Sequence, residues 1–232
     1  MRIKEGTIYE LNIPFNEAFT HSTKARTESD AIVVKLMAED GTVGYGEGLP
    51  RPYVSGESVE FSLDHIENVL WPRIQSASYS AVNEVSQLAQ FDASLGDPVA
   101  EGVIAPTASR ATVEIALIDC ALRSVNRGLG EFFPPLREQV EYAGVIPANK
   151  PEKAASHAKK MSMLGLKHLK IKIAMGDDLA RIQSVVDVVG KDTPIRLDAN
   201  AAWSLEEALG RIAELEQFNI EAIEAPIART TV

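Results

Sequence analysis

The pattern of apolar and polar positions gives the first third of the chain a strand-like rhythm. Loosely alternating or β-branched segments at 7–13, 31–38 and 43–47 are typical of β-strands. Asp40-Gly41 separates the last two segments and predicts a hairpin turn, because glycine adopts positive φ angles without strain. The polar segment 15–30 shows no periodicity and is predicted to be a long loop. We therefore expect a three-stranded antiparallel sheet.

Helical periodicity replaces this rhythm further along the chain. It covers 58–70 and 82–91, and it is strongest at 112–126, where Arg127-Gly128 ends the pattern. Strands followed by helices predict an α+β domain, which we place at residues 1–132.

The second half of the chain alternates regularly between strands and helices. Strand-like segments at 140–146, 167–173, 194–198 and 220–224 are separated by helical ones at 151–164, 177–189 and 205–217, with Ser204 as the expected N-cap of the last. This alternation predicts parallel strands with crossover helices, in a barrel or an open sheet. A closed eight-stranded barrel takes about 250 residues and about ninety follow the first of these strands. We therefore expect about four strands in residues 133–232, truncated after the fourth.

Composition narrows the possible functions. The 232 residues carry 23 Lys+Arg and 33 Asp+Glu, and a net charge of −10 argues against a nucleic-acid or anionic-membrane partner. A single cysteine, Cys120, excludes an internal disulfide and a multi-cysteine metal site and fits a reducing cytoplasm. No apolar run approaches the roughly 18–20 residues of a membrane span, and no signal peptide is expected.

Three predicted strands end in ionisable residues at equal spacing. Lys172, Asp198 and Glu224 are 26 residues apart, one strand–helix unit each, so we expect them level at the edge where active sites of parallel α/β folds form. Lys170 shares the face of Lys172 because strand side chains alternate. Two neighbouring carboxylates repel each other unless a cation lies between them. Mg²⁺ with oxygen ligands suits this role, and a lysine beside the metal becomes a usable proton acceptor.

Each of these residues taken alone has a plainer interpretation. The lysines could be exposed strand residues, Asp198 a turn or N-cap aspartate, and Glu224 a solvated strand end. Their coincidence at matching positions favours a site.

Five motifs in the same order make the chain similar to the enolase superfamily, in its mandelate racemase / muconate lactonizing enzyme family. They are Gly44-Tyr45-Gly46-Glu47, the helical segment 114–119, Lys170-Ile171-Lys172, Asp198-Ala199-Asn200 and Ile223-Glu224-Ala225-Pro226. The resemblance implies an α+β N-terminal capping domain at 1–132, followed by a TIM-like (β/α) barrel of which residues 133–232 form the first half.

The resemblance also implies roles for individual residues. Lys172 would be the acid/base that removes or returns a proton α to a carboxylate, and Lys170 its neighbour that keeps it unprotonated. Asp198 and Glu224 would be two of three ligands of Mg²⁺, with Mn²⁺ as a possible substitute, a use of lysine and metal known for this superfamily. The substrate-binding residues would be His21, Arg26, Tyr53 and Asn200, the first three on loops of the capping domain.

Two hypotheses follow from this resemblance. The chain is a Mg²⁺-dependent isomerase or lyase, of the muconate cycloisomerase or dipeptide epimerase type, that acts on a small-molecule carboxylate in the cytoplasm. Alternatively, it is a truncated or split chain without catalysis of its own, because the third metal ligand and a second lysine are expected on later strands. The expected partners are a second copy of the chain in a homo-oligomer, or a chain that completes the barrel.

Overall fold

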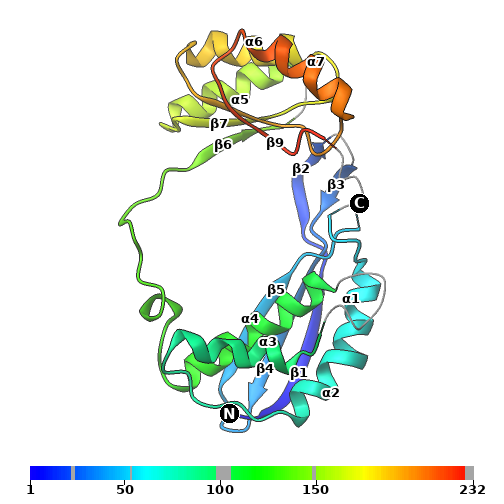
Figure 1. Ribbon diagram of the computed structural model, residues 1–232, viewed down its shortest axis with the longest axis vertical. Helices are drawn as coiled ribbons and strands as arrows, with labels where there is room; N and C mark the ends of the chain where they lie inside the picture. The colour runs from blue at the N-terminus through cyan, green and yellow to red at the C-terminus, as the bar shows by residue number, and fades with distance from the viewer. Residues whose placement is uncertain (22–23, 53, 98–105, 148–149, 228–232) are drawn as a thin grey trace. The chain divides into compact units, whose positions relative to one another are not determined.

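The computed structural model describes residues 1–21, 24–52, 54–97, 106–147 and 150–227, without the side chains of 17–21, 24 and 25 (Figure 1). It divides into two compact units, each with its own apolar core. The first unit comprises Met1–Pro14 and Glu28–Leu136, and the second comprises Phe15–Thr27 and Arg137–Val232. The domain boundary between residues 132 and 133 stays a prediction, since the two units interleave along the chain.

The sheet of the first unit is the predicted three-stranded antiparallel one. Strands β1 (Ile3–Leu11), β4 (Ala31–Ala38) and β5 (Val43–Gly48) pair in the order β1-β4-β5. The central strand β4 buries alternate residues, including Val34 and Leu36, which is why its sequence is almost wholly apolar. Gly41 turns the chain with φ +85°, and the Asp40 carboxylate accepts a 2.9 Å hydrogen bond from the Thr42 amide.

Helices cover this sheet. For two of them, the first residue differs from the one that the sequence periodicity predicts. They are α1 (Val59–His65), the π-helix η1 (Ile66–Leu70), α2 (Trp71–Ser76), the 3-10 helix η2 (Val85–Leu88), α3 (Ala89–Ser94), α4 (Thr107–Ser124) and the 3-10 helix η4 (Leu129–Glu131). The helix predicted at 82–91 is a 3-10 turn followed by the short α3. Helix α4 begins five residues earlier than predicted. The buried Glu57 accounts for this, because its carboxylate accepts from the amides of Ala108 and Ser109 at 2.5 and 3.2 Å.

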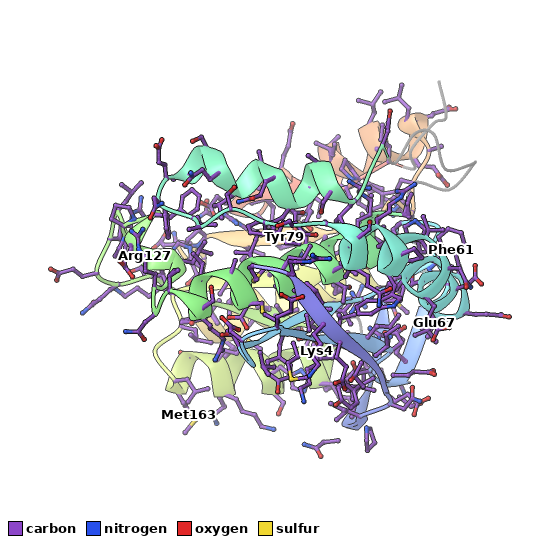
Figure 2. All side chains as sticks on the ribbon, turned by 90° about the horizontal axis from the view of Figure 1, so that it is seen from below. Lys4, Phe61, Glu67, Tyr79, Arg127 and Met163 are labelled. Carbon is purple, nitrogen blue, oxygen red and sulfur yellow. The ribbon has the colours of Figure 1, made fainter. Side chains whose placement is uncertain are left out.

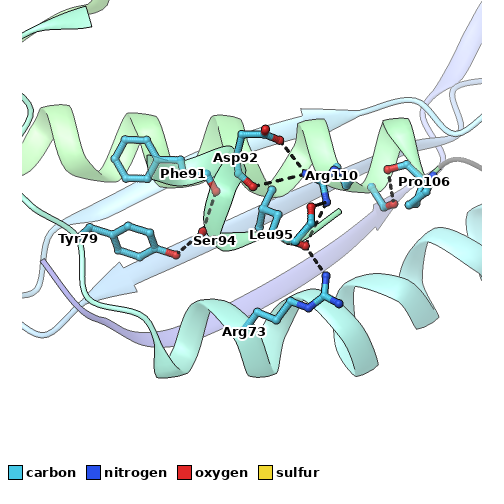
Figure 3. Close-up of polar contacts among 10 residues, drawn as sticks. Arg73, Tyr79, Phe91, Asp92, Ser94, Leu95, Pro106 and Arg110 are labelled. Atoms are coloured by element: carbon cyan, nitrogen blue, oxygen red, sulfur yellow. Dashed lines mark hydrogen bonds and ion pairs between the residues drawn. The ribbon is translucent and has the colours of Figure 1, made fainter. Parts of the chain in front are cut away.

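A buried arginine joins α3 to α4 (Figure 3). Arg110 donates to the carbonyls of Leu95 and Gly96 at 3.1 and 2.8 Å and forms a 2.7 Å ion pair with Asp92. Arg73 of α2 donates to the same Leu95 carbonyl. These bonds satisfy a guanidinium that would otherwise be costly to bury.

Three glycines of β5 let α4 lie directly on the strand. A Cβ at Gly44 would lie 2.3 Å from the Cys120 amide, and one at Gly46 would lie 2.0 Å from the Thr112 carbonyl oxygen. The Gly-x-Gly pattern of the first half is therefore a packing requirement of the sheet and its helix.

The segment 15–30 is not the loop predicted from the sequence. It contains strands β2 (Pro14–His21) and β3 (Lys24–Glu28), which pair as a separate two-stranded sheet. Apolar and polar residues occur in pairs along β2, and β3 is mostly polar, so no regular alternation marks either strand in the sequence. Most of this segment belongs to the second unit.

The second unit has the predicted parallel strands and crossover helices. Strands β6 (Ala143–Ile146), β7 (His168–Lys172), β8 (Ile195–Asp198) and β9 (Ile220–Glu224) pair in that order, and one face carries α5 (Pro151–Met163), α6 (Asp178–Val189) and α7 (Leu205–Leu215) (Figure 1). Ser204 caps α7 as expected, since its hydroxyl oxygen accepts from the Glu207 amide at 3.3 Å. The fold is thus an antiparallel capping sheet with helices, followed by half a barrel.

Several apolar side chains of this unit face solvent. Leu205 and Leu209 of α7 are exposed, and Met163 extends from the end of α5 (Figure 2). In the described part of the chain, β6 and β9 each have a strand neighbour on one side only. No helix among the described residues is long and apolar enough to cross a membrane.

We predict that Gly46→Ala lowers the free energy of unfolding of the first unit by about 3 kcal/mol, because the new Cβ meets backbone of α4 that cannot move freely. The measurement is urea unfolding followed by Trp71 fluorescence in a Trp203→Phe background. Gly130→Ala is the matched control, since nothing lies within 4 Å of its Cβ position. Equal stability of the two variants would contradict the packing argument.

Candidate active site

Parallel pairing places three ionisable residues level at the C-terminal ends of β7, β8 and β9. Lys172 lies opposite Asp198, which lies opposite Glu224. Lys170 stands two residues before Lys172 and shares its face of the sheet. The structure therefore brings together the four residues that the sequence singled out at the strand ends.

Two lysines of the chain supply the positive charge between the carboxylates. The Lys170 Nζ lies 2.7 Å from Glu224 Oε2 and 2.8 Å from Asp198 Oδ2. The Lys172 Nζ lies 2.6 Å from the same Asp198 oxygen and 2.9 Å from Asn200 Oδ1. A single ammonium, that of Lys170, thus joins both carboxylates.

Burial decreases from Asp198, the most buried of these side chains, to Glu224, the most exposed. Asp198 is 1% exposed and Lys172 8%, whereas the Lys170 side chain is 23% exposed and that of Glu224 61%. Asp198 is therefore the fixed centre of the site, and Glu224 lies at its open side.

The charges of the lysines and carboxylates shift each other's pKa values. Burial favours the neutral form of Asp198, but hydrogen bonds from Lys170 and Lys172 outweigh it and lower the pKa of this carboxyl. Burial likewise acts to lower the pKa of Lys170, but its bonds to Asp198 and Glu224 prevail and raise it. The arrangement therefore favours a charged Lys170.

Residues in the left-handed conformation follow the strands. Asn200 and Ala201 have φ of 51° and 58°, and Ala225 has φ of 42°. The Ala201 amide donates to the Ala225 carbonyl at 2.7 Å, and the Asn200 amide donates to Asp198 Oδ1 at 2.9 Å. These turns direct the Asn200 amide group back to the site. Nothing in the sequence marks an alanine for this conformation, and the strain it carries is of a kind often found at functional sites.

Of the three other predicted substrate-binding residues, the structure describes the side chain of Arg26. Tyr53 and the side chain of His21 are outside the described residues. Arg26 is half-buried, and its guanidinium lies 5.6 Å from the centre of the Phe15 ring. Arg196 lies opposite Lys170 on β8, but its side chain pairs with Glu221 at 3.3 Å and not with the carboxylates of the site.

The second unit also contains a pocket of about 370 Å³, which is separate from the strand-end residues. Residues of α6 and α7 line it together with Trp203, and it includes none of the four strand-end residues. Its charged side chains form local contacts, such as the 3.2 Å pair between Arg211 and Glu214. The convergent charges lie at the strand ends.

The donor atoms at the strand ends are oxygens, the element that a hard divalent cation prefers as ligand. Two carboxylates and an amide oxygen are the ligand types that Mg²⁺ takes, and the shared contact with Lys170 shows that one cation can reach both acids. The set is small, however. Among the described residues, no group of three or more His, Cys, Asp or Glu side chains could hold a metal ion.

Comparison with known proteins identifies relatives along the whole chain. Residues 5–133 match the mandelate racemase / muconate lactonizing enzyme N-terminal domain, and residues 153–232 match the enolase C-terminal domain-like family. A hydrophobic dipeptide epimerase of Enterococcus faecalis is 29% identical over 99% of this chain and 62% of its own length.

Solved structures agree with these matches. The N-succinyl Arg/Lys racemase of Bacillus cereus superposes with a TM-score of 0.87 at 25% identity, over 98% of this chain and 60% of the racemase. A dipeptide epimerase of Enterococcus faecalis, complexed with Mg and the dipeptide L-Leu-L-Tyr, superposes with a TM-score of 0.83 at 28% identity, over 98% of this chain and 62% of the epimerase. The chain spans about 60% of the length of these relatives. Both family matches and the shared fold show that it belongs to the mandelate racemase / muconate lactonizing enzyme family of the enolase superfamily.

Proposed function

We propose that this chain is the capping domain and first half-barrel of a Mg²⁺-dependent isomerase or lyase that removes a proton α to a carboxylate. The row of Lys172, Asp198 and Glu224 at the strand ends is the observation that carries the proposal. The relatives' names favour racemisation or epimerisation and a small dipeptide-like carboxylate as substrate. The enzyme would act in the cytoplasm.

In this proposal Lys172 is the acid/base. Its ammonium is held by Asp198 and Asn200 and faces the side of the sheet that carries no helix, where a substrate can approach. Asn200 orients Lys172, and Lys170 holds positive charge close to the substrate's carboxylate. His21, Arg26 and Tyr53 would select the substrate.

Asp198 and Glu224 would hold the metal through their carboxylate oxygens. When bound, Mg²⁺ would neutralise the negative charge that develops on the substrate carboxylate as the α-proton leaves. The two acids lie on adjacent strands at one level, which lets them share one cation.

We further propose that the 232-residue chain needs a partner or further chain to complete the barrel. It spans about 60% of its relatives, and in the described part β6 and β9 have one free edge each. A third metal ligand and a second lysine would come from the completing segment, or a second copy of the chain would cover the free edges.

We predict that Asp198→Asn and Glu224→Gln each weaken Mg²⁺ binding at least fivefold, because each removes one of two anionic ligands. Lys172→Ala should not weaken it, since an ammonium contributes no ligand. The measurement is isothermal titration calorimetry of Mg²⁺ into the chain. Glu221→Gln is the matched control on β9, because Glu221 pairs with Arg196 instead of the site lysines. A loss of affinity in Glu221→Gln equal to that in Glu224→Gln would rule out the assigned ligands.

A second prediction concerns activity. The chain alone should not exchange the α-proton of a dipeptide such as L-Leu-L-Tyr with solvent deuterium, and it should self-associate, because its strand edges and the apolar face of α7 are uncovered. Sedimentation velocity and NMR detection of exchange in D₂O measure the two properties. A stable monomer that exchanges the proton at enzymatic rates would refute the need for completion.

A further inference from the structure

The ammonium of Lys170 lies where the two acidic residues of the site converge. It contacts Asp198 Oδ2 and Glu224 Oε2 at 2.8 and 2.7 Å, the two carboxylates that would share a divalent cation. Lys172 differs from Lys170 because its ammonium contacts Asp198 and Asn200 instead of joining Asp198 to Glu224. The Lys170 ammonium thus bridges the two carboxylates.

We propose that Lys170 is an internal competitor of the divalent cation. The inference rests on the proposed function, because it takes Asp198 and Glu224 as the metal ligands. The site has two arrangements, one in which the Lys170 ammonium joins the carboxylates and one in which the metal joins them and Lys170 has withdrawn.

Electrostatics makes the two arrangements exclusive. A divalent ion held by the same two carboxylates would lie close to the Lys170 ammonium, and like charges repel each other strongly at short range in a partly buried site. The 23% exposed Lys170 side chain has a flexible four-carbon stem and can withdraw toward solvent. Lys172 contacts Asp198 and Asn200 and does not bridge the two carboxylates, so it need not leave the space between them.

The competition has three consequences. Lys170 holds the carboxylates together when metal is absent, and it lowers the apparent metal affinity because the ion must first displace it. The ammonium released by the metal becomes available to an anionic group of the substrate, so the metal would bind before the substrate.

The test compares Lys170→Met with Lys167→Met. Both remove one positive charge from the same region of the chain, but Lys167 is 79% exposed and lies 3.8 Å from Glu141, away from the site. We expect Lys170→Met to bind Mg²⁺ at least fivefold more tightly than the unaltered chain, and Lys167→Met to remain within twofold. Calorimetry with Mg²⁺ and electron paramagnetic resonance of free Mn²⁺ give the affinities. Unchanged or weaker binding by Lys170→Met would overturn the proposal.

Stability without metal supplies a second readout. Lys170→Met leaves two carboxylates without their bridging cation, so its midpoint of thermal unfolding should fall in EDTA and rise with saturating Mg²⁺ by more than that of the unaltered chain. Lys170→Gln should behave in the same way, and Lys170→Arg, which keeps the charge, should resemble the unaltered chain. Equal Mg²⁺-induced shifts in the Gln and Arg variants would contradict competition, even if Lys170→Met fails to fold.

Asp198→Asn separates the two hypotheses. If it abolishes Mg²⁺ binding while Lys170→Met fails to tighten it, the metal site stands and the competition is refuted. If Asp198→Asn leaves Mg²⁺ binding unchanged both in the unaltered chain and in the Lys170→Met variant, the metal ligands of the proposed function are wrong.

Discussion

Two carboxylates held level on adjacent parallel strands repel each other unless a cation lies between them, and the arrangement of side chains at the strand ends depends on that constraint. Asp198 and Glu224 face the same side of the sheet, and the Lys170 ammonium touches both. The pairing keeps a buried aspartate ionised in a place where desolvation would otherwise favour its neutral form. In the proposed function, the same requirement would let a divalent metal bind at the strand ends.

Strand register supplies this geometry, and the helices fix the register. The opposite face of the strands is apolar, with Leu169, Ile171 and Leu197 buried in the core of the second unit. A shift by one residue would turn these side chains away from the helices and move the lysines into the core, at a cost no ion pair could offset. Packing that never touches the site therefore places Lys172, Asp198 and Glu224 at one level.

Sequence periodicity was sufficient for the features that depend on local alternation. It predicted the three-stranded sheet, the four parallel strands and the meeting of Lys172 with Asp198, because each follows from a period of two or from one strand–helix unit. Periodicity could not predict features that depend on residues far away in the sequence. The start of α4 depends on Glu57, some fifty positions away, and the sequences of β2 and β3 show no regular apolar alternation.

The contact of Lys170 with both carboxylates also escaped sequence reasoning, for a physical reason. The spacing showed that something positive must lie between the acids, and it could not tell a metal from a lysine. The left-handed Ala201 and Ala225 were hidden for a different reason, because alanine carries no preference for that conformation. Identity and spacing determine which groups meet, whereas side-chain reach and turn geometry determine which atoms touch.

The burial gradient across the sheet indicates where the proposed completion must attach. Exposure rises from the central β8 to the edge strand β9, from 1% at Asp198 to 61% at the Glu224 side chain. On the helix side, the apolar residues Leu205 and Leu209 of α7 are exposed, so both layers lack cover beside the same strand. A strand paired to β9, with its helix against α7, would bury this surface and enclose Glu224. Glu224, the more exposed of the two proposed metal ligands, thus lies at the open edge. The segment that closes the fold there would also complete the proposed metal site.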